Sequence, residues 1–467
     1  MFQQGSEKRF SVYYAALFGS IGAISPFFAL WLDHGGISAS MIGLIVATPS
    51  VAMLFTTIAL GRWADRLRDR RTAVVVANWV IFFAHVPLIF STSPWLLLAL
   101  WCVSGIAMHA MVPATDAAAL SLTARQGSDF ARIRVYGSIG FIAALTLAGM
   151  LYERQGIAMF IVLLVLGNLS RLVFAYRLPV IPTAQSAQSM NPASVSSATP
   201  ATPATPATPA TPATPATSAT SATPATPATP ATSATSVALA ANLAGEDKQA
   251  PPVSLKTESY RAGRGGDAPP DSDQRDPLYR PAIVLTLIGA ALINASHAVF
   301  NTFGILLWTQ QGLSETVSSL AVSAGVVAEV ILMWRFKSLT QDISARALLI
   351  FAALCGVVRW SVLAIEPSLP LLIAVQLLHG VTFGMMYLAG ASFISRRVPE
   401  SDAARGQAML ATLTTACMAS AMFISGVLFD QWGGALYWGM TLCCCSALLV
   451  LVGSYRFMLP AEASPIV

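Results

Sequence analysis

The sequence predicts an all-α polytopic membrane protein with twelve transmembrane helices in two six-helix bundles. Of its 467 residues, 55% are hydrophobic and 10% are charged, and the mean hydropathy is +0.65. A soluble domain carries about 25% charged residues, so a soluble catalytic domain of ordinary type is excluded. The apolar residues also fall in blocks of about 20, the length of a helix that crosses a bilayer.

Each apolar block is expected to be a helix, because backbone groups inside lipid must be hydrogen-bonded within the chain. The first block follows Lys8 and Arg9 and contains Pro26. It is too long for the apolar core of a signal peptide and is interpreted as an uncleaved span. The expected spans are 10–32, 38–61, 73–92, 94–116, 134–152, 156–176, 281–309, 315–335, 345–364, 368–394, 404–428 and 434–457.

A polar insert divides these spans six and six. Residues 199–236 repeat Ala-Thr-Pro or Ala-Thr-Ser, and proline at every third position disfavours helix and favours an extended, solvated chain. With few large apolar residues, the insert cannot bury enough surface to fold. We therefore expect an N-terminal six-helix bundle over 1–178, a disordered Ala-Thr-Pro-rich spacer over 179–279 and a C-terminal six-helix bundle over 280–467.

Basic residues predict the orientation of the chain. The loops after even-numbered spans and the two termini hold nearly every Lys and Arg, whereas the opposite loops hold only Arg154. By the positive-inside rule, both termini and the linker are cytoplasmic. The net charge of +5 follows from these loops and does not indicate nucleic-acid binding. The six cysteines all lie in apolar stretches and are expected to face lipid or the protein core.

Charged residues inside the spans are the sharpest functional signal, because an unpaired charge in lipid costs several kcal/mol. Glu329 lies in the eighth span and Arg359 in the ninth, while Asp116 ends the fourth span and Arg134 opens the fifth. A structural ion pair is the alternative for Glu329 and Arg359. Ordinary interfacial charge is the alternative for Asp116 and Arg134.

Two pairs of polar residues share helix faces inside the second half. His297 and Asn301 are four residues apart, and Gln376 and His379 are three apart. A hydrogen-bonded contact between helices is the alternative for each histidine. The sequence has no phosphate-binding glycine loop and no Cys, His or carboxylate cluster with metal-site spacing. ATP-driven transport, enzymatic activity, cofactors and metals are therefore not expected.

The segment Gly61-Arg-Trp-Ala-Asp65-Arg66-Leu-Arg-Asp-Arg70-Arg71 resembles the loop 2–3 signature of the major facilitator superfamily. Gly61, Asp65, Arg66 and Arg70 match that signature. Two positions depart from it: Arg68 stands where glycine is usual, and Asp69 where a basic residue is usual. The resemblance implies a conformational latch in which Asp65 pairs with a basic residue or a helix end across the cytoplasmic face.

Other segments look like the 3-phenylpropionate permease family, which is similar to lactose permease and to nucleoside–proton symporters. The likeness covers all twelve spans and excludes the insert. It implies the major facilitator fold and proton-coupled uptake across the bacterial inner membrane, with the proton gradient as energy source. The matching segments are Pro113-Ala-Thr-Asp116-Ala, Arg132-Ile-Arg134-Val-Tyr-Gly-Ser-Ile-Gly140-Phe, Gly325-Val-Val-Ala-Glu329-Val-Ile, Cys355-Gly-Val-Val-Arg359-Trp and Val375-Gln376-Leu-Leu-His379-Gly.

The similarity to lactose permease implies roles for single residues. Asp116 and Arg134 match the carboxylate and arginine of its sugar site, while Arg359 and His379 match its proton machinery. The glutamate that lactose permease has one turn after the histidine is Thr382 here. We therefore expect Glu329 to carry the proton, with Arg359 changing its proton affinity as the two groups approach and separate.

The sequence leaves the substrate open. A small aromatic acid needs a cation, Arg134 or Arg359, and an aromatic wall, whereas a neutral sugar or nucleoside suits an Asp116–Arg134 pair that bonds hydroxyls. We expect a functional monomer in contact with lipid and a small-molecule substrate. The expected substrate-binding residues are Asp116, Arg134, Tyr136, His297, Asn301 and Gln376, and the candidate wall residues are Trp31, Tyr136, Phe300, Phe303, Trp360 and Tyr387.

An exporter of drugs or metabolites on the same fold is the runner-up. Proton-coupled exporters of this superfamily usually carry a Gly-Pro pair with clustered glycines in the fifth span. The fifth span here, from Gly137 to Gly149, contains no proline. A membrane enzyme or a sensor is a third class, but it needs a clustered catalytic set or an ordered soluble domain, and the sequence has neither.

Overall fold

The computed structural model describes residues 5–90, 93–181 and 277–457, which lie mainly in helices joined by short loops, with no β-strand among them. The predicted linker lies largely outside these residues. The first half comprises α1 (Gly5–Ile24), η1 (Ser25–Phe27), α2 (Phe28–His34), α3 (Ala39–Arg66), α4 (Arg70–His85), η2 (Val86–Ile89), α5 (Pro94–Gln126), α6 (Phe130–Gln155) and α7 (Met159–Tyr176). The second half comprises η4 (Pro277–Tyr279), α10 (Pro281–Ala295), α11 (Ala298–Gln310), α12 (Glu315–Thr340), α13 (Ala345–Ala364), α14 (Leu369–Gln376), η5 (Gly380–Met385), α15 (Met386–Arg397), α16 (Glu400–Trp432), η6 (Gly433–Ala435), α17 (Leu436–Ser454) and η7 (Tyr455–Phe457).

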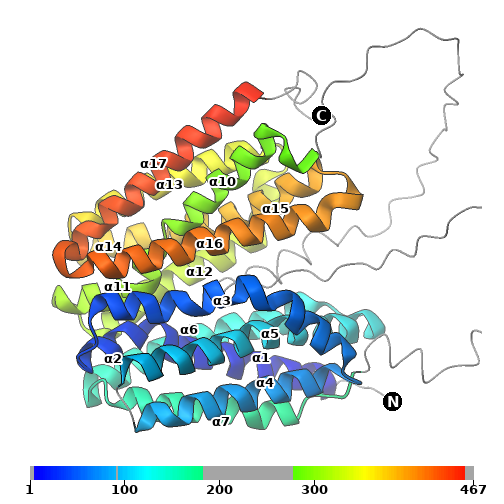
Figure 1. The fold of residues 1–467 in the computed structure, drawn as a ribbon, viewed down its shortest axis with the longest axis vertical. Helices are drawn as coiled ribbons and strands as arrows, with labels where there is room; N and C mark the ends of the chain where they lie inside the picture. The colour runs from blue at the N-terminus through cyan, green and yellow to red at the C-terminus, as the bar shows by residue number, and fades with distance from the viewer. Residues whose placement is uncertain (1–4, 91–92, 182–276, 458–467) are drawn as a thin grey trace, which may run out of the picture.

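The twelve predicted spans are confirmed. Eleven continuous helical stretches of the described residues are long and apolar enough to cross a membrane, and the last of them, Ala403–Phe457, contains both α16 and α17. The chain reverses between these two helices at η6, where Gly433 has a φ of 45°. In Figure 1, α17 runs back in the opposite direction to α16, so this stretch crosses twice.

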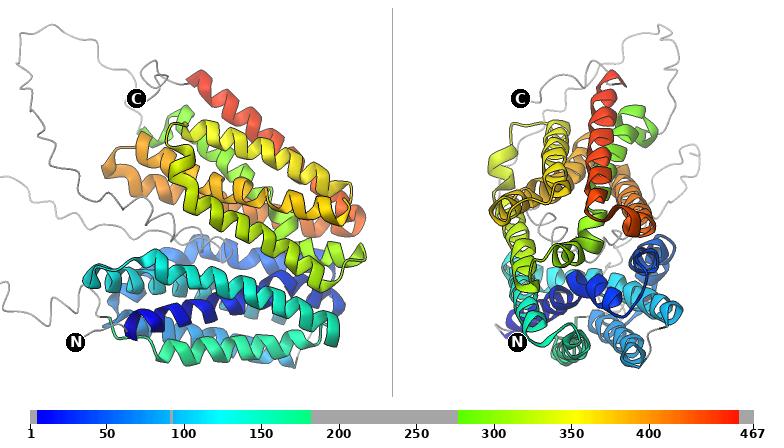
Figure 2. Two further views of the ribbon diagram at one scale, coloured as in Figure 1. Left: turned by 180° about the vertical axis from the view of Figure 1, so that it is seen from behind. Right: turned by 90° about the vertical axis from the view of Figure 1, so that its left-hand side faces the viewer.

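The helices form two bundles that lie one above the other in Figure 1. We call the end of the molecule with the loops 66–70, 126–130, 340–345 and 397–400 the basic face, and the end with the loops 35–38, 155–158, 311–314, 365–368 and 433–435 the opposite face. Figure 2 shows the bundles close together at the opposite face and splayed apart toward the basic face.

Two helix pairs join the bundles near the opposite face. In the first pair, α3 meets α16 so closely that a Cβ on Gly43 would lie 2.7 Å from the Cα of Gly426. In the second pair, α6 meets α12, where the hydroxyls of Thr146 and Ser323 are 3.3 Å apart. Small and hydroxyl side chains allow such close helix packing inside a membrane.

Three predicted spans are interrupted away from their ends. The first bends through η1, where Pro26 removes a backbone donor. The seventh breaks at Ser296 and His297, between α10 and α11. The tenth changes from α14 to the π-helical η5 just after His379. π-Helical turns and broken membrane helices are frequent at functional sites, and these three breaks surround the cavity described below.

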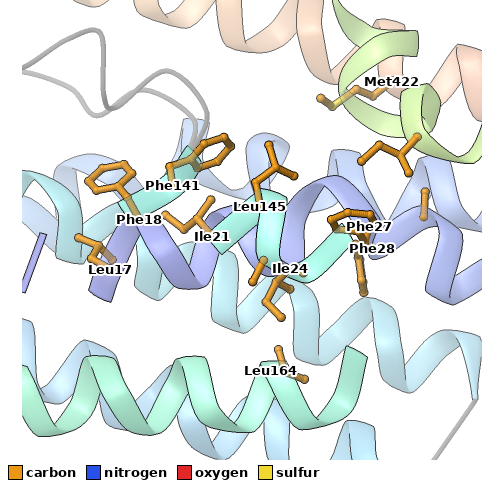
Figure 3. Packing of buried hydrophobic residues seen from close by; sticks show 14 of the residues in the cluster. Leu17, Phe18, Ile21, Ile24, Phe27, Phe28, Phe141, Leu145, Leu164 and Met422 are labelled. Carbon is orange, nitrogen blue, oxygen red and sulfur yellow. The ribbon is translucent and has the colours of Figure 1, made fainter. Parts of the chain in front are cut away.

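A buried apolar core holds the first bundle together. Figure 3 shows Phe18 and Ile21 of α1 beside Phe141 and Leu145 of α6. Residues at both ends of the linker also pack on the bundles. Ile181 is buried against the first bundle, and Leu278 belongs to the core of the second. The packed part of each bundle thus reaches slightly into the range 179–279 expected for the linker.

Candidate functional site

A cavity lies between the two bundles, beside the three helix breaks. It encloses about 940 Å³ of space not filled by atoms, part of which is open to solvent. Most of its wall is apolar, and two ionisable side chains, Glu329 and His379, reach it. The lining residues are Ser25, Pro26, Ser138, Phe141, Phe300, Asn301, Ile305, Val322, Val326, Glu329, Val330, Met333, His379 and Phe383.

A chain of three ionisable groups runs from the cavity into the second bundle. Nε2 of His379 lies 3.4 Å from Oε2 of Glu329, and a guanidinium nitrogen of Arg359 lies 3.1 Å from Nδ1 of His379. A guanidinium only donates hydrogen bonds, so Nδ1 must accept and the ring proton sits on Nε2, facing Glu329. His379 is thus held neutral between the cation and the carboxylate.

Arg359 is fully buried behind the cavity wall, with an exposed fraction of 0%. Besides His379, it donates to Oε1 of Gln376 at 2.8 Å and to the hydroxyl of Thr382 at 3.0 Å. Its guanidinium carbon also lies 4.9 Å from the ring centroid of Phe300 and 4.4 Å from that of Trp360. These neutral bonds and aromatic faces fix the position of the cation.

His297 supports this cluster from behind and does not line the cavity. Its Nδ1 is 3.1 Å from the carbonyl oxygen of Ile293, and its Nε2 is 3.1 Å from the Thr382 hydroxyl. A carbonyl only accepts, so the proton of a neutral ring sits on Nδ1 and Nε2 accepts from Thr382. The hydroxyl of Thr382 can then accept from Arg359 and donate to His297 at once.

A second polar cluster lies in the first bundle. Nε of Arg134 is 3.8 Å from Oδ1 of Asp116, and the Tyr14 hydroxyl donates to the same carboxylate oxygen at 2.6 Å. The side chain of Asp116 is 17% exposed, and that of Arg134 is 2% exposed. None of the three guanidinium nitrogens of Arg134 has a hydrogen-bond partner within the described residues. The rings of Tyr14 and Phe18 cover the guanidinium at 5.1 and 4.0 Å.

Only some of the predicted substrate-binding residues line the cavity. Asn301 lines the cavity, whereas His297 and Gln376 lie behind it and hold the Arg359 cluster. Asp116 and Arg134 are paired but lie outside the cavity lining. Tyr136 is 48% exposed on α6 and is also absent from the lining.

Likewise, only some of the candidate aromatic wall residues lie at the cavity. Phe300 lines the cavity, and Trp360 is buried beneath the guanidinium of Arg359. Trp31 stacks on Phe160 within the first bundle, with ring centroids 4.8 Å apart. Two further residues pack elsewhere: Phe303 stacks on Phe429, and Tyr387 packs against the core of the second bundle. Phe141 and Phe383 complete the aromatic part of the cavity wall.

The predicted latch loop joins α3 to α4 at the basic face. Gly61 and Arg66 belong to α3, and the backbone nitrogen of Arg70 donates to the carbonyl oxygen of Ile181 at 3.0 Å. The side chain of Asp65 lies outside the described part of the chain, so its pairing stays a prediction. Asp69, a departure from the signature, has a local role: its carboxylate accepts from the backbone nitrogen of Thr72 at 2.9 Å and caps α4.

A further buried cation, Arg171 of α7, was not expected from the sequence. It donates to the amide oxygen of Asn168 and contacts the sulfur of Met108. The amide nitrogen of Asn168 in turn lies 2.9 Å from Nδ1 of His85 on α4. The sequence does carry a signal for this cluster: Arg171 is an arginine inside an apolar span, and Asn168 lies three residues before it. Tyr14 and Ser138 were missed, and no role was predicted for Thr382, because neutral residues of these types are common in membrane helices.

Comparison with known proteins shows the family to which the chain belongs. The family model described as the MFS_1 like family matches residues 8–440. The chain belongs to the MFS_1 like family. It is therefore a transporter of the major facilitator superfamily that spans the membrane, and not an enzyme.

Individual proteins similar to this chain are also transporters. The chain is 25% identical over 440 residues to a probable 3-phenylpropionic acid transporter of Escherichia coli K12, which covers 94% of this chain and 95% of the relative. The nucleoside transporter NupG has a similar fold, with a TM-score of 0.68, 12% identity and coverage of 97% and 99%. A D-xylose–proton symporter matches with a TM-score of 0.61, 11% identity and coverage of 99% and 100%.

Proposed function

We propose that this protein is a proton-coupled secondary transporter that takes up a small aromatic acid of the 3-phenylpropionate class. It works by alternating access, as a monomer in the bacterial inner membrane, with the termini and the linker in the cytoplasm. The proton gradient supplies the energy, and no cofactor takes part. The relative that spans nearly the whole chain is a probable transporter of such an acid, which supports this substrate class.

The observation that carries the proposal is a carboxylate on an apolar wall between the two bundles. Glu329 is buried at the cavity, with His379 at 3.4 Å and Arg359 behind it. A carboxylate in such a place is costly unless it is paired or protonated, so it marks a proton or substrate pathway. Phe141, Phe300 and the aliphatic side chains around it suit the ring of an aryl acid.

The same geometry supports alternating access. The bundles are joined near the opposite face and are splayed apart at the basic face (Figure 2). With the basic face in the cytoplasm, this conformation is closed toward the outside. Rocking of the bundles about the cavity then exposes Glu329 to either side in turn.

A neutral nucleoside or sugar is the second candidate, favoured by the Asp116–Arg134 pair. The guanidinium nitrogens of Arg134 have no hydrogen-bond partners among the described residues, and the carboxylate of Asp116 is partly exposed. Donors and acceptors so arranged suit the hydroxyls of a sugar ring. Ionised 3-phenylpropionate has no hydrogen-bond donor for the carboxylate of Asp116.

Binding to the purified protein tests the choice of substrate. A true substrate binds the folded state and raises the melting temperature with its concentration. We expect 3-phenylpropionate to do so at acidic pH, and uridine and maltose to have no effect at the same concentrations. Stabilisation by uridine or maltose alone would overturn the aryl-acid assignment.

A further inference from the structure

We propose that Arg359 is a fixed counter-charge that makes transport electroneutral, so that each substrate carboxylate crosses with one proton, carried on Glu329. The inference rests on the proposed function, because it requires an anionic substrate. It adds the stoichiometry, the absence of net charge movement and the reason that neither ligand crosses alone.

The first observation is that the cation stands behind the cavity wall. Among the described residues that line the cavity there is no arginine or lysine, and the ionisable members are Glu329 and His379. Arg359 is not among the lining residues: it lies against the ring of Phe300, which does line the cavity, and it bonds to the neutral side chains of His379, Thr382 and Gln376. A substrate carboxylate therefore meets Glu329 before any cation.

The second observation concerns the groups that face Glu329 from the helices around it. His379 approaches from the α14–η5 junction and is held neutral by the bond from Arg359 of α13. His297, at the α10–α11 junction, does not line the cavity and contacts Thr382 and the His379 ring. On the other bundle, α6 contributes Ser138 to the cavity, and its Arg134 is already paired with Asp116. The charge near the cavity is therefore set by Glu329 and Arg359.

These two groups give two electroneutral states. With the cavity empty, an ionised Glu329 balances Arg359. With a carboxylate bound, the negative charge of the substrate balances Arg359, and Glu329 must be protonated. The other two combinations, a bound anion beside ionised Glu329 or an empty site with protonated Glu329, each leave one net charge in a low-dielectric site, which is strongly disfavoured.

Coupling follows from this balance. The proton turns Glu329 from a repelling acceptor into a donor that can hydrogen-bond the substrate carboxylate. Only the balanced states pass through the closed intermediate of alternating access, so proton and anion move together and the empty carrier returns unprotonated. A dicarboxylate would leave a second charge uncompensated and is expected to be rejected.

The inference is tested with the full chain in proteoliposomes on a solid-supported membrane, and protein-free vesicles correct for passive diffusion of the acid. We expect 3-phenylpropionate uptake that is driven by an inward pH gradient, carries no current and does not respond to a potassium diffusion potential. The variant Glu329→Gln should exchange labelled for unlabelled 3-phenylpropionate but lose the response to the pH gradient. The control Asp342→Asn, an exposed acid just after α12, should match the wild type.

Three results would count against the proposal, and they separate it from the proposed function. Wild-type 3-phenylpropionate uptake with a steady current would overturn electroneutral coupling and leave aryl-acid transport standing. A pH-gradient response retained by Glu329→Gln would overturn the role of Glu329 alone. Uptake of a nucleoside or sugar with an inward current, and none of the aryl acid, would overturn the proposed function itself.

Discussion

At the scale of residues, the arrangement around Glu329 explains how a proton can be gained and lost at a buried site. His379 cannot take a second proton without losing the hydrogen bond that Nδ1 accepts from Arg359. The carboxylate of Glu329 lies 3.4 Å from Nε2 and can bind a proton while the ring stays neutral. Protonation is therefore expected at Glu329, with His379 orienting it.

The substitution Glu329→Gln tests this role. The amide keeps the size of the side chain and a donor toward the substrate, but it cannot carry the proton. We expect proton-driven accumulation of 3-phenylpropionate in cells to be abolished, while exchange across the membrane persists. Wild-type accumulation by this variant would contradict the role given to Glu329.

The substitution Asp116→Asn tests the pairing in the first bundle. Removing one partner leaves the buried Arg134 uncompensated, which costs about 3–5 kcal/mol for a buried pair. The melting temperature of the purified protein should fall, and the double variant D116N/R134Q should recover part of the loss. A double variant less stable than D116N alone would show that the two residues do not act as a pair.

The sequence predicted the ionisable residues of the site but not how they are joined. Glu329, Arg359 and His379 could be found because charged and imidazole side chains are rare inside apolar spans. The position of His379 between the other two depends on how three separate helices pack. Thr382 and Tyr14 had no local signal, since their bonds to Arg359 and Asp116 join helices that are distant along the chain.

At the scale of helices, the span positions were predictable and the breaks within them were predictable only in part. Apolar length alone located the twelve crossings. Pro26 marks the break at η1. The break between α10 and α11 falls at Ser296 and His297, and neither residue is a proline or glycine that would predict it. Hydropathy also ended the fourth span at Asp116, whereas α5 continues to Gln126 and places the carboxylate inside the helix.

The contact between α3 and α16 supports a prediction about conformation. Gly43 leaves no room for a side chain, because its Cβ would lie 2.7 Å from the Cα of Gly426 and 3.0 Å from the carbonyl oxygen of Met422. We expect Gly43→Leu to separate the bundles at the opposite face. Spin labels at the exposed residues Asp33 and Asp430, one on each bundle, should report a longer distance.

A matched control keeps this test specific. Gly439 on α17 has no atom within 4 Å of an added Cβ, so Gly439→Leu should leave the label distance unchanged. An unchanged distance in Gly43→Leu, with the protein still folded, would show that this contact does not hold the face closed.

At the scale of the whole molecule, the two bundles are joined near one face and share a cavity that each helps to line. Ser25 and Ser138 come from the first bundle, and Glu329 and His379 from the second. Rocking of the bundles therefore changes the surroundings of Glu329, which is what a proton carrier requires. The sequence predicted the two bundles, but the closed opposite face depends on packing between distant helices such as α3 and α16.

The measurement that decides whether proton and substrate move together is lumen acidification in proteoliposomes after 3-phenylpropionate is added outside, with protein-free vesicles subtracted. The wild type should acidify the lumen by one proton for each labelled substrate taken up. Glu329→Gln should acidify no faster than empty vesicles, although it still exchanges substrate. Acidification by Glu329→Gln at the wild-type rate, or wild-type uptake with no proton movement, would contradict proton coupling through Glu329.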